Sequence, residues 1–190
     1  MIFRVGQACE AFHLVVSGQV KLFVVSPAGQ EKVIEIISPG QSFAEALVFL
    51  NKPYILSAQA LADTVLVNVS KRGVVREIEQ DPHFALHMLA GVSRRLHGLI
   101  QDVEAYSLQS GMQRLIGYLL RDVEMDAIHG KNSLTVSLPA SKATIASRLS
   151  LTPEYFSRVL HELEAQQLIT IDRRQIRILD VNTLVGYGAL

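Results

Sequence analysis

The spacing of apolar residues changes near Asp81-Pro82, and this change limits the fold more than any other feature of the sequence. Before it, residues 12–69 form short β-rich runs, which predict an all-β sheet or small barrel. The turn signals between these runs are Ser17-Gly18, Pro27-Ala28-Gly29 and Pro39-Gly40. Residues 44–51 interrupt the β pattern and predict a turn or two of helix, a natural place for ligand contact in a barrel.

After this point the spacing becomes helical. Asp81 can cap a helix, and Pro82 fits its first turn. Apolar residues then recur three and four apart, as in a coiled-coil seam: Leu89, Val92, Leu96, Leu99, Val103 and Tyr106. We predict that this helix joins two copies of the chain. The pattern also allows an amphipathic helix packed on its own domain.

The C-terminal part predicts a winged helix-turn-helix. The run SLQSG at 107–111 breaks the long helix, GMQRLIGYLLRDVEMDAI starts a second one, and a loop from His129 to Ser133 leads to the extended run LTVSLP. The helix SKATIASRL, a short turn and a helix opened by Thr152-Pro153-Glu154 make the helix-turn-helix unit. The runs LITI and QIRIL, around Asp172-Arg173-Arg174, make the wing.

The helix that starts near Thr152 has two different faces. Its apolar face consists of Phe156, Val159, Leu160 and Leu163, and its polar face of Glu154, Ser157, Arg158 and His161. Capping by Thr152 and the helix dipole account for Glu154, but not for Ser157 and Arg158. In a major groove, Arg suits guanine, Glu accepts from the cytosine amine, and Ser serves either role. The polar face therefore predicts base reading.

Composition narrows the functional classes. The 190 residues are 49% hydrophobic and 19% charged, which suits one or two soluble domains. No apolar run approaches the roughly 18 residues of a membrane span, and the start MIFRVGQACEAF lacks a secretory signal, so we expect a cytoplasmic protein. The net charge is zero, and residues 137–177 hold six basic and four acidic residues, so a case for DNA rests on geometry rather than on bulk charge.

The segment ASKATIASRLSLTPEYFSRVLHELEAQQLITI resembles the DNA-binding domain of the Crp/Fnr family of bacterial transcription regulators, and the resemblance extends over essentially the whole chain. It implies an α+β fold with a cyclic-nucleotide-binding-like β-barrel (jelly roll) at 1–80, a dimerisation helix at 81–108 and a winged helix-turn-helix at 109–190. The pattern Glu154-x-x-Ser157-Arg158 is similar to the Fnr-type reader, whereas the catabolite-activator branch carries Arg-Glu-x-x-Gly-Arg.

The resemblance also implies partners. They are a second copy of the chain, double-stranded DNA with an inverted repeat of TTGAT-like half-sites, and RNA polymerase. The residues that it places at the DNA are Thr152, Glu154, Ser157, Arg158, Arg173 and Arg174. It implies a regulator and not an enzyme.

The family resemblance does not identify the effector of this chain directly. Family members that bind cyclic AMP hold its phosphate with a Gly-Glu pair and an Arg-Ser pair. The matching segments here are Phe43-Ala44-Glu45 and Leu56-Ser57-Ala58, so Leu56 stands at the Arg position. An unpaired buried phosphate costs several kcal/mol, which disfavours a cyclic nucleotide. An iron–sulfur cluster is disfavoured because Cys9 is the only cysteine.

The run that contains FAEA resembles the Dnr/Nnr branch, whose members are associated with nitric oxide and haem. Haem is therefore a candidate cofactor, and its candidate ligands are His13, His83, His87, His97 and His161. His83 and His87 stand four apart without a carboxylate at matching spacing, so we predict no metal site there. Family members usually have a first helix and strand ahead of the point where this chain begins, and sensor ligands could lie in such a segment.

Three other functions fit the sequence less well. A cupin-like barrel enzyme would need several histidines and a carboxylate on barrel strands, where this sequence offers only His13. A cyclic-nucleotide module that regulates another protein, or a cyclic-nucleotide-responsive regulator, would need the phosphate-binding Arg that Leu56 replaces.

Overall fold

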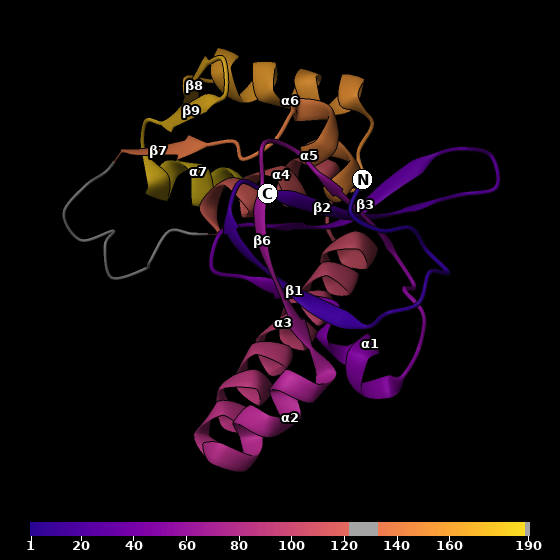
Figure 1. The fold of residues 1–190 in the computed structure, drawn as a ribbon. Coiled ribbons are helices and arrows are strands. Elements are labelled where there is room, and N and C mark those ends of the chain that lie inside the picture. The colour runs from indigo at the N-terminus through magenta and orange to yellow at the C-terminus, as the bar shows by residue number, and fades with distance from the viewer. Residues whose placement is uncertain (122–132, 189–190) are drawn as a thin grey trace. The chain divides into compact units, whose positions relative to one another are not determined.

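The computed structural model describes residues 1–121 and 133–188 (Figure 1). Internal contacts divide the chain into two compact units, Met1–Gln101 and Asp102–Leu190. The division falls inside the longest helix, α3, Pro82–Leu108. Among the described residues, no helix combines the length and the apolar character that crossing a membrane requires.

The first unit is built on two antiparallel three-stranded sheets, with strand orders β4-β1-β6 and β3-β2-β5. The strands are β1 Ala11–Ser17, β2 Val20–Val25, β3 Glu31–Ile37, β4 Ser42–Phe43, β5 Ser57–Ala60 and β6 Val65–Ser70. The all-β prediction is confirmed, but the two sheets do not close into the expected barrel. Among the described residues, the backbone pairing of these strands stays within each sheet, and no strand of one sheet pairs with a strand of the other.

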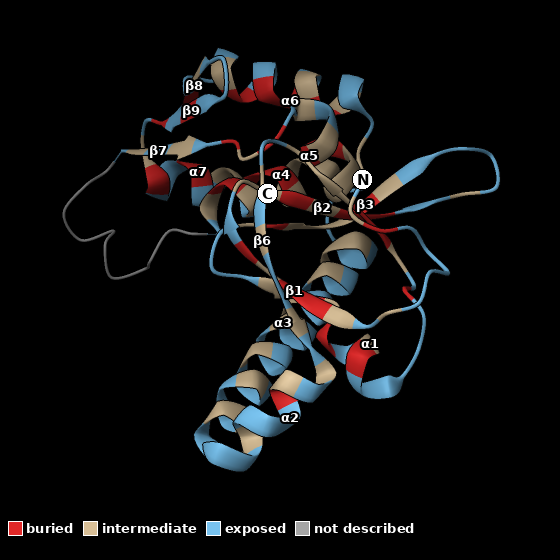
Figure 2. Ribbon diagram, in the orientation of Figure 1, coloured by how far each residue is buried: buried red, intermediate tan, exposed pale blue. Residues whose placement is uncertain are grey.

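The predicted turns all contain a glycine in the left-handed region, with φ of 79° at Gly18, 82° at Gly29 and 82° at Gly40. Gly18 is also sterically required, because a Cβ there would lie 2.3 Å from the carbonyl oxygen of Asp63. Alternating residues from both sheets fill the core, seen as red segments in Figure 2. The insert predicted at 44–51 is helix α1, Glu45–Leu50.

A ten-residue helix, α2, Lys71–Gln80, precedes α3 and was not expected. Ser70 caps it, because the Ser70 hydroxyl accepts a hydrogen bond from the amide of Gly73 at 3.2 Å. Val74 of α2 is fully buried beside Phe12 of β1. The predicted cap of α3 is confirmed, since Asp81 Oδ1 accepts from the amide of His83 at 2.9 Å.

The second unit is a winged helix-turn-helix, as predicted. Its elements are α4 Gly111–Leu120, β7 Leu134–Ser137, α5 Lys142–Arg148, α6 Pro153–Ala165, β8 Ile169–Asp172, β9 Gln175–Ile178 and α7 Val181–Gly188. Strand β7 adds to the wing, giving the order β7-β9-β8. The later part of the helix expected after Gly111, and all but the last residue of the loop expected from His129 to Ser133, lie outside the described residues.

Candidate nucleic-acid interface and effector site

Helix α6 buries its apolar face as the sequence predicts. Phe156, Leu160 and Leu163 are fully buried, and Val159 is 2% exposed. The helix begins where expected, because Thr152 Oγ1 accepts a hydrogen bond from the amide of Tyr155 at 3.2 Å and Pro153 occupies the first turn. Burial of these side chains fixes which face of α6 remains at the surface.

The opposite face of α6 carries the predicted base-reading residues. Glu154 and Arg158 are exposed, and Ser157 between them is half-buried. Residues three and four apart on a helix are neighbours, so these three side chains share one patch near the N-terminal end of α6. His161, on the same face, is exposed and lies 3.7 Å from Glu164, measured from Nδ1 to Oε2. The patch offers both donors and acceptors.

The wing places two arginines at its tip. Arg173 and Arg174 form the turn between β8 and β9, and both are exposed. Arg173 adopts a left-handed φ of 53° there. The carbonyl of Arg174 accepts from the amide of Leu138 at 2.8 Å, which ties this turn to the segment that follows β7. The arrangement suits contact with phosphate groups.

A polar cluster at the end of α3 escaped the sequence analysis. Arg148, the last residue of α5, donates to Asp102 Oδ2 at 2.6 Å and to the Tyr106 hydroxyl at 2.5 Å. That hydroxyl in turn donates to the carbonyl oxygen of Arg148 at 2.5 Å. Burial raises the pKa of Tyr106, and the charge of Arg148 offsets part of the rise. The cluster holds the last turns of α3 against the helix-turn-helix within the second unit.

The predicted dimerisation residues lie on an exposed stripe of α3. The exposed fractions are 62% for Leu89, 43% for Val92, 59% for Leu96, 41% for Leu99 and 65% for Val103. Tyr106 differs from these five, because it is half-buried and bonded to Arg148. The described residues of each unit therefore leave these five side chains exposed, which favours a partner molecule over packing within the domain.

One of the predicted effector residues, Glu45, carries a carboxylate that already has a partner. Glu45 is 7% exposed, and its Oε2 accepts from Arg95 Nη1 at 2.8 Å. Arg95 comes from α3, also donates to the carbonyl of Ser42, and places Nε 3.2 Å from Glu35 Oε2 without hydrogen-bond geometry. The Ser42 hydroxyl donates to the other oxygen of Glu45. Sequence reasoning missed Arg95, which stands 50 residues from Glu45.

The remaining effector residues are apolar or used in the fold. Phe43 is fully buried, and Leu56 packs against the same core cluster. Ser57 is 9% exposed, and its hydroxyl accepts from the amide of Val5 at 3.2 Å. Ala44 has a φ of 72°, the conformation for which glycine is best suited. Leu56 supplies no charge at the position where phosphate binders carry Arg.

His13 is the only buried member of the predicted haem ligands. Its Nδ1 lies 2.7 Å from Asn68 Oδ1 and its Nε2 3.1 Å from the Tyr54 hydroxyl, so both ring nitrogens are engaged. The Phe43 ring is 5.0 Å away, centroid to centroid. Burial raises the pKa of Tyr54, with a further contribution from Cys9.

The other four histidines are exposed on helices: His83, His87, His97 and His161. The structure therefore does not bring the haem candidates together. In the part of the chain that it describes, no three His, Cys, Asp or Glu residues are grouped as a metal site. These residues do not form a haem site in the arrangement found here, because His13 would have to give up one of its two hydrogen bonds to become a ligand.

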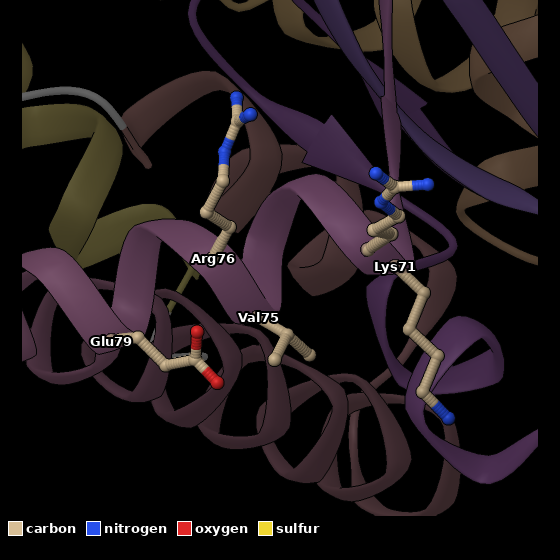
Figure 3. Close-up of a pocket in the computed structure, with 5 residues that line it drawn as sticks. Lys71, Val75, Arg76 and Glu79 are labelled. Carbon is tan, nitrogen blue, oxygen red and sulfur yellow. The ribbon is translucent and has the colours of Figure 1, made fainter.

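An open hollow lies along the surface of α2 (Figure 3). It is lined by Lys71, Arg72, Val75, Arg76 and Glu79. None of the predicted effector residues contributes to it. Its lining comes from a single helix and it is open to solvent, so it is not a buried pocket for an effector.

Comparison with known proteins adds independent findings. Residues 1–81 match the cyclic nucleotide-binding domain family, and residues 113–187 match the Crp-like helix-turn-helix domain family. The chain is 26% identical over 184 residues to the cyclic AMP receptor protein of Thermus thermophilus, covering 94% of this chain and 82% of the relative.

Two solved structures extend the comparison. A protein of Ruegeria pomeroyi DSS-3, classed with cyclic nucleotide-binding proteins, is 32% identical with a TM-score of 0.66, covering 100% of this chain and 81% of that one. FixK2 of Bradyrhizobium japonicum has a TM-score of 0.79 at 22% identity, covering 96% of this chain and 90% of that one, and shows the likeness of the fold alone.

Proposed function

Because the chain belongs to the Crp/Fnr family of DNA-binding transcription regulators, we propose that it reads a palindromic TTGAT-like site as an effector-responsive homodimer. The family consists of regulators rather than enzymes. The observation that carries the proposal is the exposed face of α6, on which Glu154, Ser157 and Arg158 lie near the N-terminal end. We further propose RNA polymerase as a partner, on family resemblance.

Base reading follows from the chemistry of this face. Arg158 donates to O6 and N7 of guanine, and Glu154 accepts from the amine of the opposite cytosine or of an adjacent adenine. Each good contact contributes about 1–3 kcal/mol of discrimination. Arg173 and Arg174 in the wing contact phosphates, which adds affinity without sequence preference.

Homodimer formation is supported by the uncovered stripe on α3. Two copies packed along Leu89, Val92, Leu96, Leu99 and Val103 bury side chains that a single chain leaves in water. A two-fold dimer presents its recognition helices about 34 Å apart, one turn of DNA, which is why the site is an inverted repeat. The effector then shifts the population between two dimer arrangements by binding one of them better.

The test of base reading is a selection from randomised duplexes with the full chain, repeated on Arg158→Ala. We expect the wild type to enrich an inverted repeat, and the variant to lose preference at the G·C pair. Arg173→Ala and Arg174→Ala are the matched controls, since they remove the same side chain from the wing. They should weaken binding to all sequences alike and reduce the salt dependence. Enrichment of sites without two-fold symmetry would contradict the proposal.

For the effector we propose that cyclic AMP is not bound tightly, although the Thermus thermophilus relative is named a cyclic AMP receptor protein. Leu56 supplies no charge for a phosphate, and Glu45 is already paired with Arg95. Titration calorimetry should therefore give no binding heat at micromolar concentrations. Micromolar or tighter binding that disappears in Glu45→Gln would overturn this part of the proposal.

A haem-linked or nitric-oxide signal is the effector that we propose in its place, supported by the resemblance of the FAEA segment to the Dnr/Nnr branch. His13 is the candidate ligand to examine because it is the buried one of the five, and binding would require it to give up its hydrogen bond to Asn68 or Tyr54. We expect a shifted haem absorption band when the full chain, purified anaerobically, is titrated with haem. The shift should vanish in His13→Gln and persist in His97→Gln, the exposed control. An unshifted band with the wild type would remove haem from consideration.

A further inference from the structure

Tyr155 and Arg158 form a pair on the outer side of α6. The guanidinium carbon of Arg158 lies 4.8 Å from the centroid of the Tyr155 ring. The two residues are three positions apart, so they are neighbours on one helix face. A guanidinium group at this distance is attracted by the negative face of an aromatic ring. Arg158, which is exposed, therefore has a contact that restricts its side chain.

The Tyr155 ring also packs against the start of helix α4. A Cβ at Gly111, the first residue of α4, would lie 2.5 Å from Cε1 of Tyr155 and 3.1 Å from its Cζ. The ring therefore packs against bare backbone, which only glycine provides at this position. Leu151 shares the contact, since the same Cβ would lie 2.8 Å from its Cδ2. Tyr155 is half-buried as a result, with its orientation set by α4.

Arginine has a long side chain with many rotamers, and a mobile guanidinium must lose that freedom when it binds a base. A guanidinium that rests on a fixed ring loses less conformational freedom when it binds a base. We propose that Tyr155 is a specificity-determining positioning residue, which holds the Arg158 guanidinium in the orientation that reads guanine. The inference rests on the proposed function, because it assumes that Arg158 contacts a base. The alternative role for Tyr155 is packing between α4 and α6 alone.

Ring fluorination separates these two roles. Tyr155→Phe keeps the ring, and phenylalanine analogues with one, two and three ring fluorines at position 155 keep its shape while withdrawing electrons from its face. We would measure the ratio of dissociation constants for the selected duplex and for the same duplex with its G·C pair replaced. A nonspecific duplex is the control for phosphate contacts, and thermal unfolding of each variant is the control for packing.

Tyr155→Phe should preserve the dissociation-constant ratio, and each added fluorine should lower it, by about two- to fivefold in total. Binding to the nonspecific duplex and the unfolding midpoint should stay constant along the series. If the dissociation-constant ratio does not change with fluorination, while Arg158→Ala abolishes the preference for G·C, then Tyr155 only packs between the helices. That result would overturn this inference and leave the base-reading proposal standing. A ratio that survives Arg158→Ala would overturn the base-reading proposal, and the role of Tyr155 with it.

Discussion

Helices α6 and α3 are both amphipathic, and only α6 buries its apolar side. The four apolar residues of α6 are at most 2% exposed, whereas no residue of α3 is buried (Figure 2). One arginine of α3 also differs from the arginine of α6. Glu154 and Arg158 of α6 are exposed, while Arg95 of α3 turns inward to Glu45 and Glu35.

This difference in burial shows which kind of partner each helix can bind. Whatever a chain leaves exposed after its own packing is available to other molecules. In α6 the remaining surface is polar and carries donors and acceptors, which suits base edges. In α3 the remaining surface includes an apolar stripe, which suits a second copy of the same stripe. Four variants test this contrast.

The largest effect is expected at the stripe of α3. Replacing Leu96 and Leu99 together with Ala should weaken assembly by about 4 kcal/mol or more, because both copies lose two buried side chains. Sedimentation at micromolar protein concentration should then show a monomer. Ser93→Ala, an exposed change on the same helix, is the control and should leave a dimer. An unchanged dimer in the double variant would refute the role of the stripe.

The corresponding change in α6 should affect folding and not assembly. Leu160 is fully buried, so Leu160→Ala should lower the free energy of unfolding by about 2–5 kcal/mol. Denaturant titration measures this, and the loss should not depend on protein concentration. Glu162→Ala, exposed on the same helix, should have little effect. If Leu160→Ala instead lowered the dimer fraction of folded protein, the contrast between the helices would be wrong.

A smaller effect is expected at Arg95, the arginine of α3 that faces inward. Arg95→Met leaves the carboxylate of Glu45 buried without its cation, which should cost about 1–3 kcal/mol of stability. The neighbouring Arg94 is exposed, so Arg94→Met is a closely matched control and should change stability little. Chemical denaturation of both variants gives the comparison. Equal losses would mean that the ion pair of Arg95 adds nothing beyond its surface charge.

The smallest effect is expected at the start of α6. Thr152→Ala removes the acceptor of the Tyr155 amide and should lower stability by about 1 kcal/mol. Thr152→Ser keeps the hydroxyl and should retain most of that stability. Thermal unfolding distinguishes the two variants. If Thr152→Ala loses more free energy of DNA binding than of unfolding, then Thr152 contacts DNA directly in addition to capping the helix.

Local signals in the sequence predicted most of the helix-turn-helix unit. The spacing of Phe156, Val159 and Leu160 identified the buried face of α6, and Thr152-Pro153 identified its start. These signals act within one or two turns of chain, so a short window contains all the information. Helix α2 was missed because its first residues follow β6 without a break and its burial depends on Phe12, about 60 residues away.

The candidate effector site was only half predictable. The sequence placed Glu45 in the insert and Leu56 after it, with no Arg at the phosphate-binding position, but it could not show that Arg95 would pair with Glu45. The two residues are 50 positions apart on different elements. Likewise, helical spacing assigned Tyr106 to the stripe of α3, but it could not show that the Tyr106 hydroxyl would bond to Arg148, 42 positions away.

The sequence by itself determined the order of most elements, the faces of α6 and the glycine turns. Each depends on backbone geometry and on neighbours within a few positions. Only the tertiary structure decided which polar groups are satisfied inside the chain, namely Glu45 by Arg95 and Asp102 by Arg148. Such pairs require the ends of long segments to meet, and the free energy that brings them together comes from the core rather than from the pair itself.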